Sequence, residues 1–329
     1  MSEFVIVKKK NRKSQHIKLS QTSVTKDVDN DKDIQKIDIN NFTKRLDNCI
    51  AEVEVSPFFT ETFDIINGAL HAVRQHKTSN SSTCNQIDEQ LPTEVSSEDV
   101  LDEGSLNQSS GDRLSSVISR LEAVTVVDEP RVQLLSYGIG NFTTSLIARY
   151  QLAFFLSLRR KLKDHCQTCL VYDPVFSPDE EIILEKYSCQ LISQNEEGCR
   201  ECAEPTIAFM PHCGRPLYNN FLWKNLSTSG GQGLNKVVLI GNSFSQIVER
   251  TPKSLLRETG NYILKIQPFV KETSLPDSFI LSDVFNDLAV HSFPLAAIQT
   301  IRSDIGSPLH KPEYHRNEEE FIRNKNVTN

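Results

Sequence analysis

Five short apolar runs alternate with helix-like stretches between residues 132 and 242, and this alternation restricts the fold more than any other feature of the sequence. Each run is nearly continuous in hydrophobic residues, which is typical of strands that are covered by helices on both faces. We therefore expect an α/β domain with a mostly parallel sheet at its centre. The runs occupy residues 132–137, 169–172, 189–193, 206–210 and 237–240.

The stretches between the runs have the spacing of helices. A strand followed by a helix and a parallel strand is the unit of a doubly wound, Rossmann-like sheet, so this is the predicted fold class. Apolar runs at 262–266 and 279–281 predict further strands. The predicted helices occupy residues 144–162, 179–187, 217–226 and 245–249.

Changes in composition divide the rest of the chain. Residues 1–40 are polar and predict a disordered basic and polar arm. Hydrophobic residues at spacings of three and four over 41–74 predict a short helical segment that is interrupted at Pro57. The remaining predicted parts are a flexible polar linker at 75–112, the α/β domain at 113–310 and a charged tail at 311–329.

The formal net charge is -7, from 36 Lys and Arg against 43 Asp and Glu. A chain this acidic does not coat nucleic acid, so only the basic cluster from Lys8 to Lys13 is a candidate for such contact or for a nuclear address. No apolar run is long enough to span a membrane, and the first residues lack the order of a secretory signal. We expect a cytoplasmic protein, with nuclear access as an addition, whose eight cysteines are thiols.

Polar residues and glycines follow every predicted strand. In an open parallel sheet, ligands bind outside the carboxyl ends of the strands, so these residues are expected to share one rim. The rim predicts a small-molecule site. The candidate ligand-binding residues are Gly138, Gly140, Asn141, Asp173, Asn195, Glu196, His212, Cys213, Asn242 and Ser243.

The turn Gly138-x-Gly140 follows a strand and precedes a helix, as a nucleotide-binding turn does. The full glycine pattern is absent, because Thr143 stands at the third glycine position, and Asp173 lies further along the chain than the usual acidic residue. Binding of a nucleotide or of S-adenosylmethionine is therefore one interpretation. The other is that the glycines only shape the turn and that Asp173 caps the next loop.

His212-Cys213-Gly214 is the most reactive-looking group on the predicted rim. The histidine has the chemistry of an acid, a base or a metal ligand, and Cys213 that of a nucleophile or a haem ligand if its thiolate is stabilised. A hydrogen-bonded histidine beside a buried cysteine is the favoured alternative. No known hydrolase motif is present.

Two cysteine pairs have the spacing of half a zinc site each: Cys166 with Cys169, and Cys199 with Cys202. The gap between the pairs is longer than in the usual zinc ribbons. Cys169 also opens an apolar strand, where a cysteine packs as a small hydrophobic residue. No metal site is favoured, and zinc at these four residues is kept as the weaker alternative.

Seven motifs, in the order in which they follow one another along the chain, resemble the family named "sensitivity to red light reduced". The start of the chain is also similar to that family. The resemblance covers about 1–13 and 113–300 and does not explain the acidic linker. It implies a cytoplasmic regulator of circadian clock input and, in animals, of haem biosynthesis and clock-gene expression. It supplies no catalytic residues. The motifs lie at 137–142, 145–155, 173–177, 195–198, 210–214, 217–220 and 240–244.

Three functions remain open on the sequence. The favoured one is a regulator without enzymatic activity, whose α/β domain binds a protein partner or a small ligand. The second is an enzyme with a methyltransferase-like or nucleotide-binding site, and the third is a haem sensor that uses His212 or Cys213. The cofactor accordingly stays open among haem, S-adenosylmethionine and a nucleotide.

Overall fold

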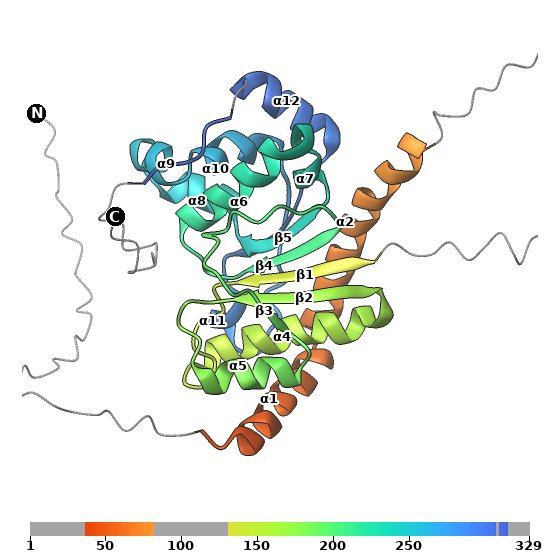
Figure 1. The fold of residues 1–329 in the computed structure, drawn as a ribbon, viewed down its shortest axis with the longest axis vertical. Helices are drawn as coiled ribbons and strands as arrows, with labels where there is room; N and C mark the ends of the chain where they lie inside the picture. Colours follow the sequence, from red (N-terminus) through yellow and green to blue (C-terminus); the bar gives the residue numbers. More distant parts are fainter. Residues whose placement is uncertain (1–36, 82–130, 307–308, 315–329) are drawn as a thin grey trace, which may run out of the picture. The chain divides into compact units, whose positions relative to one another are not determined.

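One seven-stranded sheet forms the centre of the protein (Figure 1). The computed structural model describes residues 37–81, 131–306 and 309–314. The strand order is β3-β2-β1-β4-β5-β7-β6, in which β1 to β5 are parallel and β7 is antiparallel to both of its neighbours. The strands are β1 (Val132–Tyr137), β2 (Cys166–Tyr172), β3 (Gln190–Leu191), β4 (Thr206–Met210), β5 (Val237–Asn242), β6 (Lys271–Ser274) and β7 (Leu288–Ser292).

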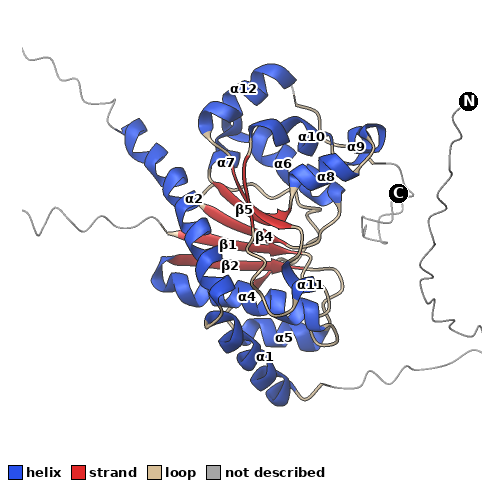
Figure 2. Ribbon diagram, turned by 180° about the vertical axis from the view of Figure 1, so that it is seen from behind, coloured by secondary structure: helices blue, strands red, loops and turns tan. Residues whose placement is uncertain are grey.

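Helices cover both faces of the sheet. On one face α4 packs on the strands and α1 packs on α4, while α2 contacts β5 and β7 (Figure 2). The other face carries α6, α7, α10 and α12. The first face has α1 (Ile39–Glu54), α2 (Pro57–Ser81), α4 (Leu146–Leu162), α5 (Pro178–Lys186) and α11 (Ser282–Phe285); the second has α6 (Arg215–Ser227), α7 (Gln232–Asn235), α8 (Phe244–Arg250), α9 (Lys253–Thr259), α10 (Asn261–Ile266) and α12 (Leu295–Ile305).

Successive residues of a central strand feed two separate hydrophobic cores. In β5, Val238 and Ile240 join the cluster beneath α1, α2 and α4, whereas Val237 and Leu239 join the cluster beneath α6. All four side chains are fully buried. This is why the run is hydrophobic at every position, and the predicted sheet with helices on both faces is confirmed in this respect.

The predicted strand at 262–266 is wrong, because this segment is helix α10. Tyr262, Ile263 and Ile266 are its buried residues, and their spacing is that of one face of a helix. No strand forms at 279–281 either, where Phe279 packs on Phe58 and Phe285 instead. A short apolar run does not by itself separate a strand from a helix.

The two strands at the end of the sheet were not predicted. β6 has the sequence Lys-Glu-Thr-Ser and lies at the sheet edge, where the side chains of a strand are largely exposed and need not be apolar. Helix α2 begins at Pro57 and runs to Ser81, further than the helical segment expected at 41–74. The predicted arm, linker and tail lie largely outside the described residues, as do Lys8 and Lys13.

None of the helices in the described ranges is both long and apolar enough to cross a membrane. All seven cysteines in these ranges are unpaired thiols, as predicted for them.

The buried carboxylate of Glu180 ties the start of α5 to the turn that follows β1. It accepts hydrogen bonds from the Thr143 amide at 2.9 Å and from the Ser177 amide at 2.9 Å. Ser177 in turn caps the Glu180 amide, which completes a capping box. The segment between β2 and α5 thus fixes the segment between β1 and α4.

We expect Glu180→Ala to lower the free energy of unfolding by about 2 kcal/mol, since it leaves two partly buried amides without their acceptor. Glu181→Ala, at an exposed position of the same helix turn, is the matched control and should cost less than about 1 kcal/mol. Urea unfolding of both variants measures the difference. Equal losses would show that Glu180 acts only through its charge at the helix terminus.

Candidate ligand-binding site

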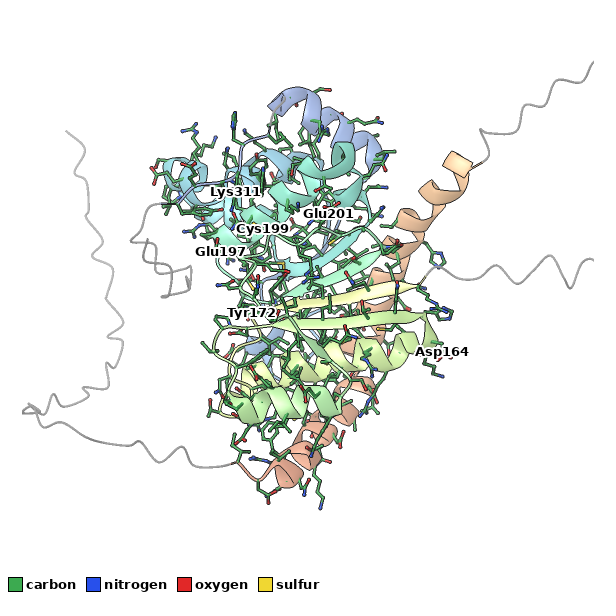
Figure 3. The ribbon with its side chains drawn as sticks, viewed as in Figure 1. Asp164, Tyr172, Glu197, Cys199, Glu201 and Lys311 are labelled. Carbon is green, nitrogen blue, oxygen red and sulfur yellow. The ribbon has the colours of Figure 1, made fainter. Side chains whose placement is uncertain are left out.

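A pocket of about 190 Å³ lies at the carboxyl ends of β1, β2 and β4, which is the edge where the sequence predicts a site. In Figure 3, Tyr172 and Glu197 lie at this edge, and Asp164 lies at the opposite end of β2. The pocket is lined by Tyr137, Gly138, Tyr172, Asp173, Pro174, Asn195, Glu197, Gly198, His212, Cys213, Gly214 and Leu217.

Half of the ten candidate residues line this pocket, and the other half do not. Gly138, Asp173, Asn195, His212 and Cys213 come together from four different strand ends. The remaining candidates hold turns, loops or helix ends near the pocket. They are Gly140, Asn141, Glu196, Asn242 and Ser243.

Gly138 and Cys213 form the floor of the pocket. Gly138 has a φ of +73°, which side chains rarely adopt, and a Cβ built there would lie 2.4 Å from the sulfur of Cys213. The sulfur lies 3.4 Å from the Tyr137 carbonyl oxygen, to which the thiol donates. Glycine is therefore required here both by the turn and by the close approach of the β4 exit.

The Asp173 carboxylate holds the turn on its other side. Oδ2 accepts from the Gly140 amide at 2.7 Å, and Oδ1 accepts from the Val175 amide at 3.0 Å. Burial raises the pKa of Asp173, against the two amide hydrogen bonds, and nearby Glu180 raises it further. A carboxylate that loses solvation while it lines a pocket is typical of a binding site.

The environments of Cys213 and His212 favour the interpretation of a hydrogen-bonded histidine beside a buried cysteine. Burial raises the pKa of the Cys213 thiol, with a smaller effect from Asp173, so the thiolate needed for nucleophilic attack or haem ligation is disfavoured. His212 Nε2 lies 3.3 Å from the Val284 carbonyl oxygen, which can only accept, so this nitrogen carries the proton. Only Nδ1 of this exposed ring remains for other contacts.

Glu196 belongs to a structural network rather than to the pocket wall. Arg200 donates to both of its carboxylate oxygens, at 2.8 and 2.6 Å, and the hydroxyl of buried Tyr137 donates at 2.9 Å. Asn141 likewise accepts from Thr144 and closes the turn before α4. These residues shape the site without facing it.

Ser243 and Asn242 lie at the end of β5. Ser243 caps α8 by accepting from the Gln246 amide, and its hydroxyl donates to Glu272. Asn242 Nδ2 donates to the Cys213 carbonyl oxygen at 3.1 Å and so supports the floor of the pocket from behind. Its buried Oδ1 has no hydrogen-bond partner within the described part of the chain.

The pocket contains residues that the sequence did not single out. Glu197 faces it next to Asn195, whose Oδ1 accepts from the Glu197 amide. The Glu197 carbonyl accepts from Asn220 Nδ2, and Asn220 Oδ1 accepts from the Tyr314 hydroxyl at 2.9 Å. The segment 309–314 therefore supports one wall of the pocket, and no local sequence signal indicates a contact over this chain distance.

The two cysteine pairs do not converge. Cys169 is buried in the cluster on one face of the sheet, 3.5 Å from the sulfur of Cys189, whereas Cys202 is buried in the cluster on the other face. Cys166 begins β2, the strand that also contains Cys169, and Cys199 lies three residues before Cys202 in the chain. Within the described residues, no group of three or more His, Cys, Asp or Glu side chains is arranged to hold a metal ion.

The charge of the pocket is negative. In the part of the chain that the structure describes, its lining includes the carboxyl groups of Asp173 and Glu197, and no lysine or arginine. Arg149, in the first turn of the following helix α4, donates to the Phe142 and Thr143 carbonyls and so is engaged by the turn itself. The arrangement is suited to a neutral or cationic ligand that carries hydrogen-bond donors.

A mostly parallel sheet with helices on both faces and a pocket at its carboxyl edge defines an α/β domain with a candidate site at that edge. Residues 115–292 match the SRR1 domain family, and the chain belongs to this family. The resemblance inferred from the sequence motifs is thereby confirmed. The matched segment contains all of the pocket-lining residues.

Curated relatives support the same family. The chain is 42% identical to an SRR1-like protein from Mus musculus over 136 residues, or 41% of this chain and 53% of that protein. It is 36% identical to Protein SENSITIVITY TO RED LIGHT REDUCED 1 from Arabidopsis thaliana over 122 residues, or 37% of this chain and 43% of that protein. The chain thus spans about half the length of the curated relatives it matches. No solved structure shows a significant match.

We expect Gly138→Ala to destabilise the protein by about 1 kcal/mol more than Gly140→Ala. Both positions have positive φ, but nothing lies within 4 Å of a Cβ at Gly140, so this variant measures backbone strain alone. The excess should disappear in a Cys213→Ala background, which removes the clashing sulfur. Urea unfolding of Gly138→Ala, Gly140→Ala, Cys213→Ala and the double variant Gly138→Ala/Cys213→Ala tests this. An excess destabilisation that persists without the sulfur would contradict the assigned contact.

Proposed function

We propose that the protein is a regulator whose SRR1 domain responds to a small ligand bound at the carboxyl edge of the sheet. The observation that carries the proposal is the desolvated Asp173 carboxylate beside the Gly138 turn, inside a pocket that four strand ends build. Such a group costs folding free energy when it is ionised, and a ligand with hydrogen-bond donors offsets this cost.

The biological role that we propose is the one the family resemblance implies, namely control of clock-gene expression and of haem biosynthesis from the cytoplasm, with access to the nucleus. Family membership and the red-light name of the Arabidopsis relative support it. In this scheme the occupied and the empty pocket present different surfaces to a protein partner, because a ligand shifts a conformational equilibrium only if it binds one state better.

A haem sensor is the less supported alternative. The Cys213 thiol donates to a backbone carbonyl, and its raised pKa disfavours the thiolate ligand. The two carboxyl groups of the pocket also repel the propionates that haem carries. Regulation of haem biosynthesis therefore does not require haem in this pocket.

A methyltransferase-like site is the alternative that a specific observation favours. The parallel strands have the order 3-2-1-4-5 of doubly wound nucleotide-binding sheets, and an antiparallel β7 stands between β5 and β6. The Gly138 turn after β1 and Asp173 after β2 occupy the places of the glycine turn and of the ribose-binding acidic residue in such sheets. This is an analogy of fold, and it bears on the ligand more directly than on any reaction.

The test is complementation of cells that lack the endogenous protein with the Asp173→Asn variant. We expect a loss of normal clock-gene rhythm and haem level from a variant that still folds, with the free energy of unfolding lowered by about 1–2 kcal/mol, because the single side-chain oxygen of Asn can accept from only one of the Gly140 and Val175 amides. Glu181→Gln, an exposed carboxyl on the following helix, is the matched control and should restore both. Full restoration by Asp173→Asn at equal protein level would overturn a regulatory role for the pocket.

A further inference from the structure

We infer that the pocket is built to exclude phosphate and takes a phosphate-free nucleoside ligand, neutral or cationic, such as adenosine or S-adenosylmethionine. The inference rests on the proposed ligand pocket and specifies its chemistry. Three observations carry it: the engaged amides of the turn after β1, the charges around the pocket, and the carboxylate at the end of β2.

In nucleotide-binding sheets of this kind, the turn after the first strand and the start of the next helix offer their amides to phosphate. Here five of these amides already donate within the protein. Gly140 donates to Asp173, Thr143 to Glu180, and Thr144 to the side chain of Asn141. The Gly138 amide donates to the Tyr172 carbonyl and the Ser145 amide to the Asn141 carbonyl, so these groups are also occupied.

The identity of the acceptors strengthens the exclusion. The Asp173 and Glu180 carboxylates occupy the amides of Gly140 and Thr143, and each carboxylate would repel a phosphate at this turn. At the start of α4, the helix presents Leu146 and Ile147, which are 50% and 42% exposed, and Ser145 caps the Ala148 amide. Among the described residues, no lysine or arginine lines the pocket to compensate.

The same residues suit a ribose and a base. In doubly wound sheets, an acidic residue at the end of the second strand accepts hydrogen bonds from ribose hydroxyls, and Asp173 lies at the end of β2. Tyr172 and Leu217 add apolar surface to the pocket, and Asn195 adds an amide. Glu197 adds a second negative charge, which favours a cationic group such as a sulfonium or an amine.

The experiment is calorimetric titration of the full chain with five probes at one ionic strength: adenosine, S-adenosylmethionine, AMP, ATP and NAD. We expect adenosine and S-adenosylmethionine to bind at least tenfold more tightly than AMP, and ATP and NAD more weakly still. Asp173→Asn should weaken adenosine binding at least tenfold, whereas Glu181→Gln should leave it unchanged.

A charge variant separates exclusion of phosphate from mere weak binding. Glu197 uses its backbone rather than its carboxyl group to hold the pocket wall. Glu197→Lys should therefore narrow the preference for adenosine over AMP by about tenfold and keep adenosine binding measurable. An unchanged preference would contradict the electrostatic basis of the inference.

Two outcomes overturn the ligand class. If AMP, ATP or NAD binds as tightly as adenosine, the pocket accepts phosphate, and the inference is wrong while the proposed regulatory pocket stands. If none of the five probes binds the wild-type chain, the nucleoside class is wrong. In that case the complementation by Asp173→Asn still decides separately whether the pocket has a regulatory role.

Discussion

Two carboxylates from one short segment hold the turn on which the rest of the site depends. Asp173, directly after β2, and Glu180, in the first turn of α5, reach to the backbone amides of Gly140 and Thr143. This fixes the path of the chain from β1 into α4, and with it the position of Gly138 against Cys213. The pocket floor, its acidic character and the engaged amides therefore share one cause.

Glu180 and Asp173 make the same kind of contact with backbone amides but differ in their effect on stability. Glu180 is fully buried and satisfied by a capping box, so it stabilises the fold. Asp173 also holds backbone amides, but burial raises its pKa, which means that its ionised form is less stable than it would be in water. Since its folded pKa lies above the unfolded value, ionisation costs stability as pH rises through this range. A residue kept at such a cost is suited to binding.

The sequence predicts the centre of the fold well, because strands that are buried on both faces must be apolar at every position. The limits of β1 and β4 are those expected from the runs at 132–137 and 206–210. β6 could not be found this way, since Lys271–Ser274 lies at an edge and carries no apolar pattern. The run at 262–266 was wrongly predicted as a strand for the opposite reason: it is apolar, but its buried residues lie on one face of a helix.

The site could be predicted only as far as the edge of the sheet. Asn141, Glu196 and Ser243 are the residue types that bind ligands, but the same types cap helices and close turns, and here they do so. Their roles are decided by distances of a few ångströms that composition does not encode. The support that Tyr314 gives to Asn220 is likewise invisible in the sequence.

The family match indicates which part of this architecture carries the shared function. Residues 115–292 contain every pocket-lining residue, whereas α1 and α2 lie outside the match and cover one face of the sheet. A helix pair that covers a hydrophobic face can be replaced by any cover of suitable shape and polarity. The carboxyl edge has no such freedom, because Asp173, Gly138 and Cys213 constrain one another within a few ångströms. Under the proposed function, the pocket is therefore the part of the chain in which a change of sequence most directly becomes a change of function.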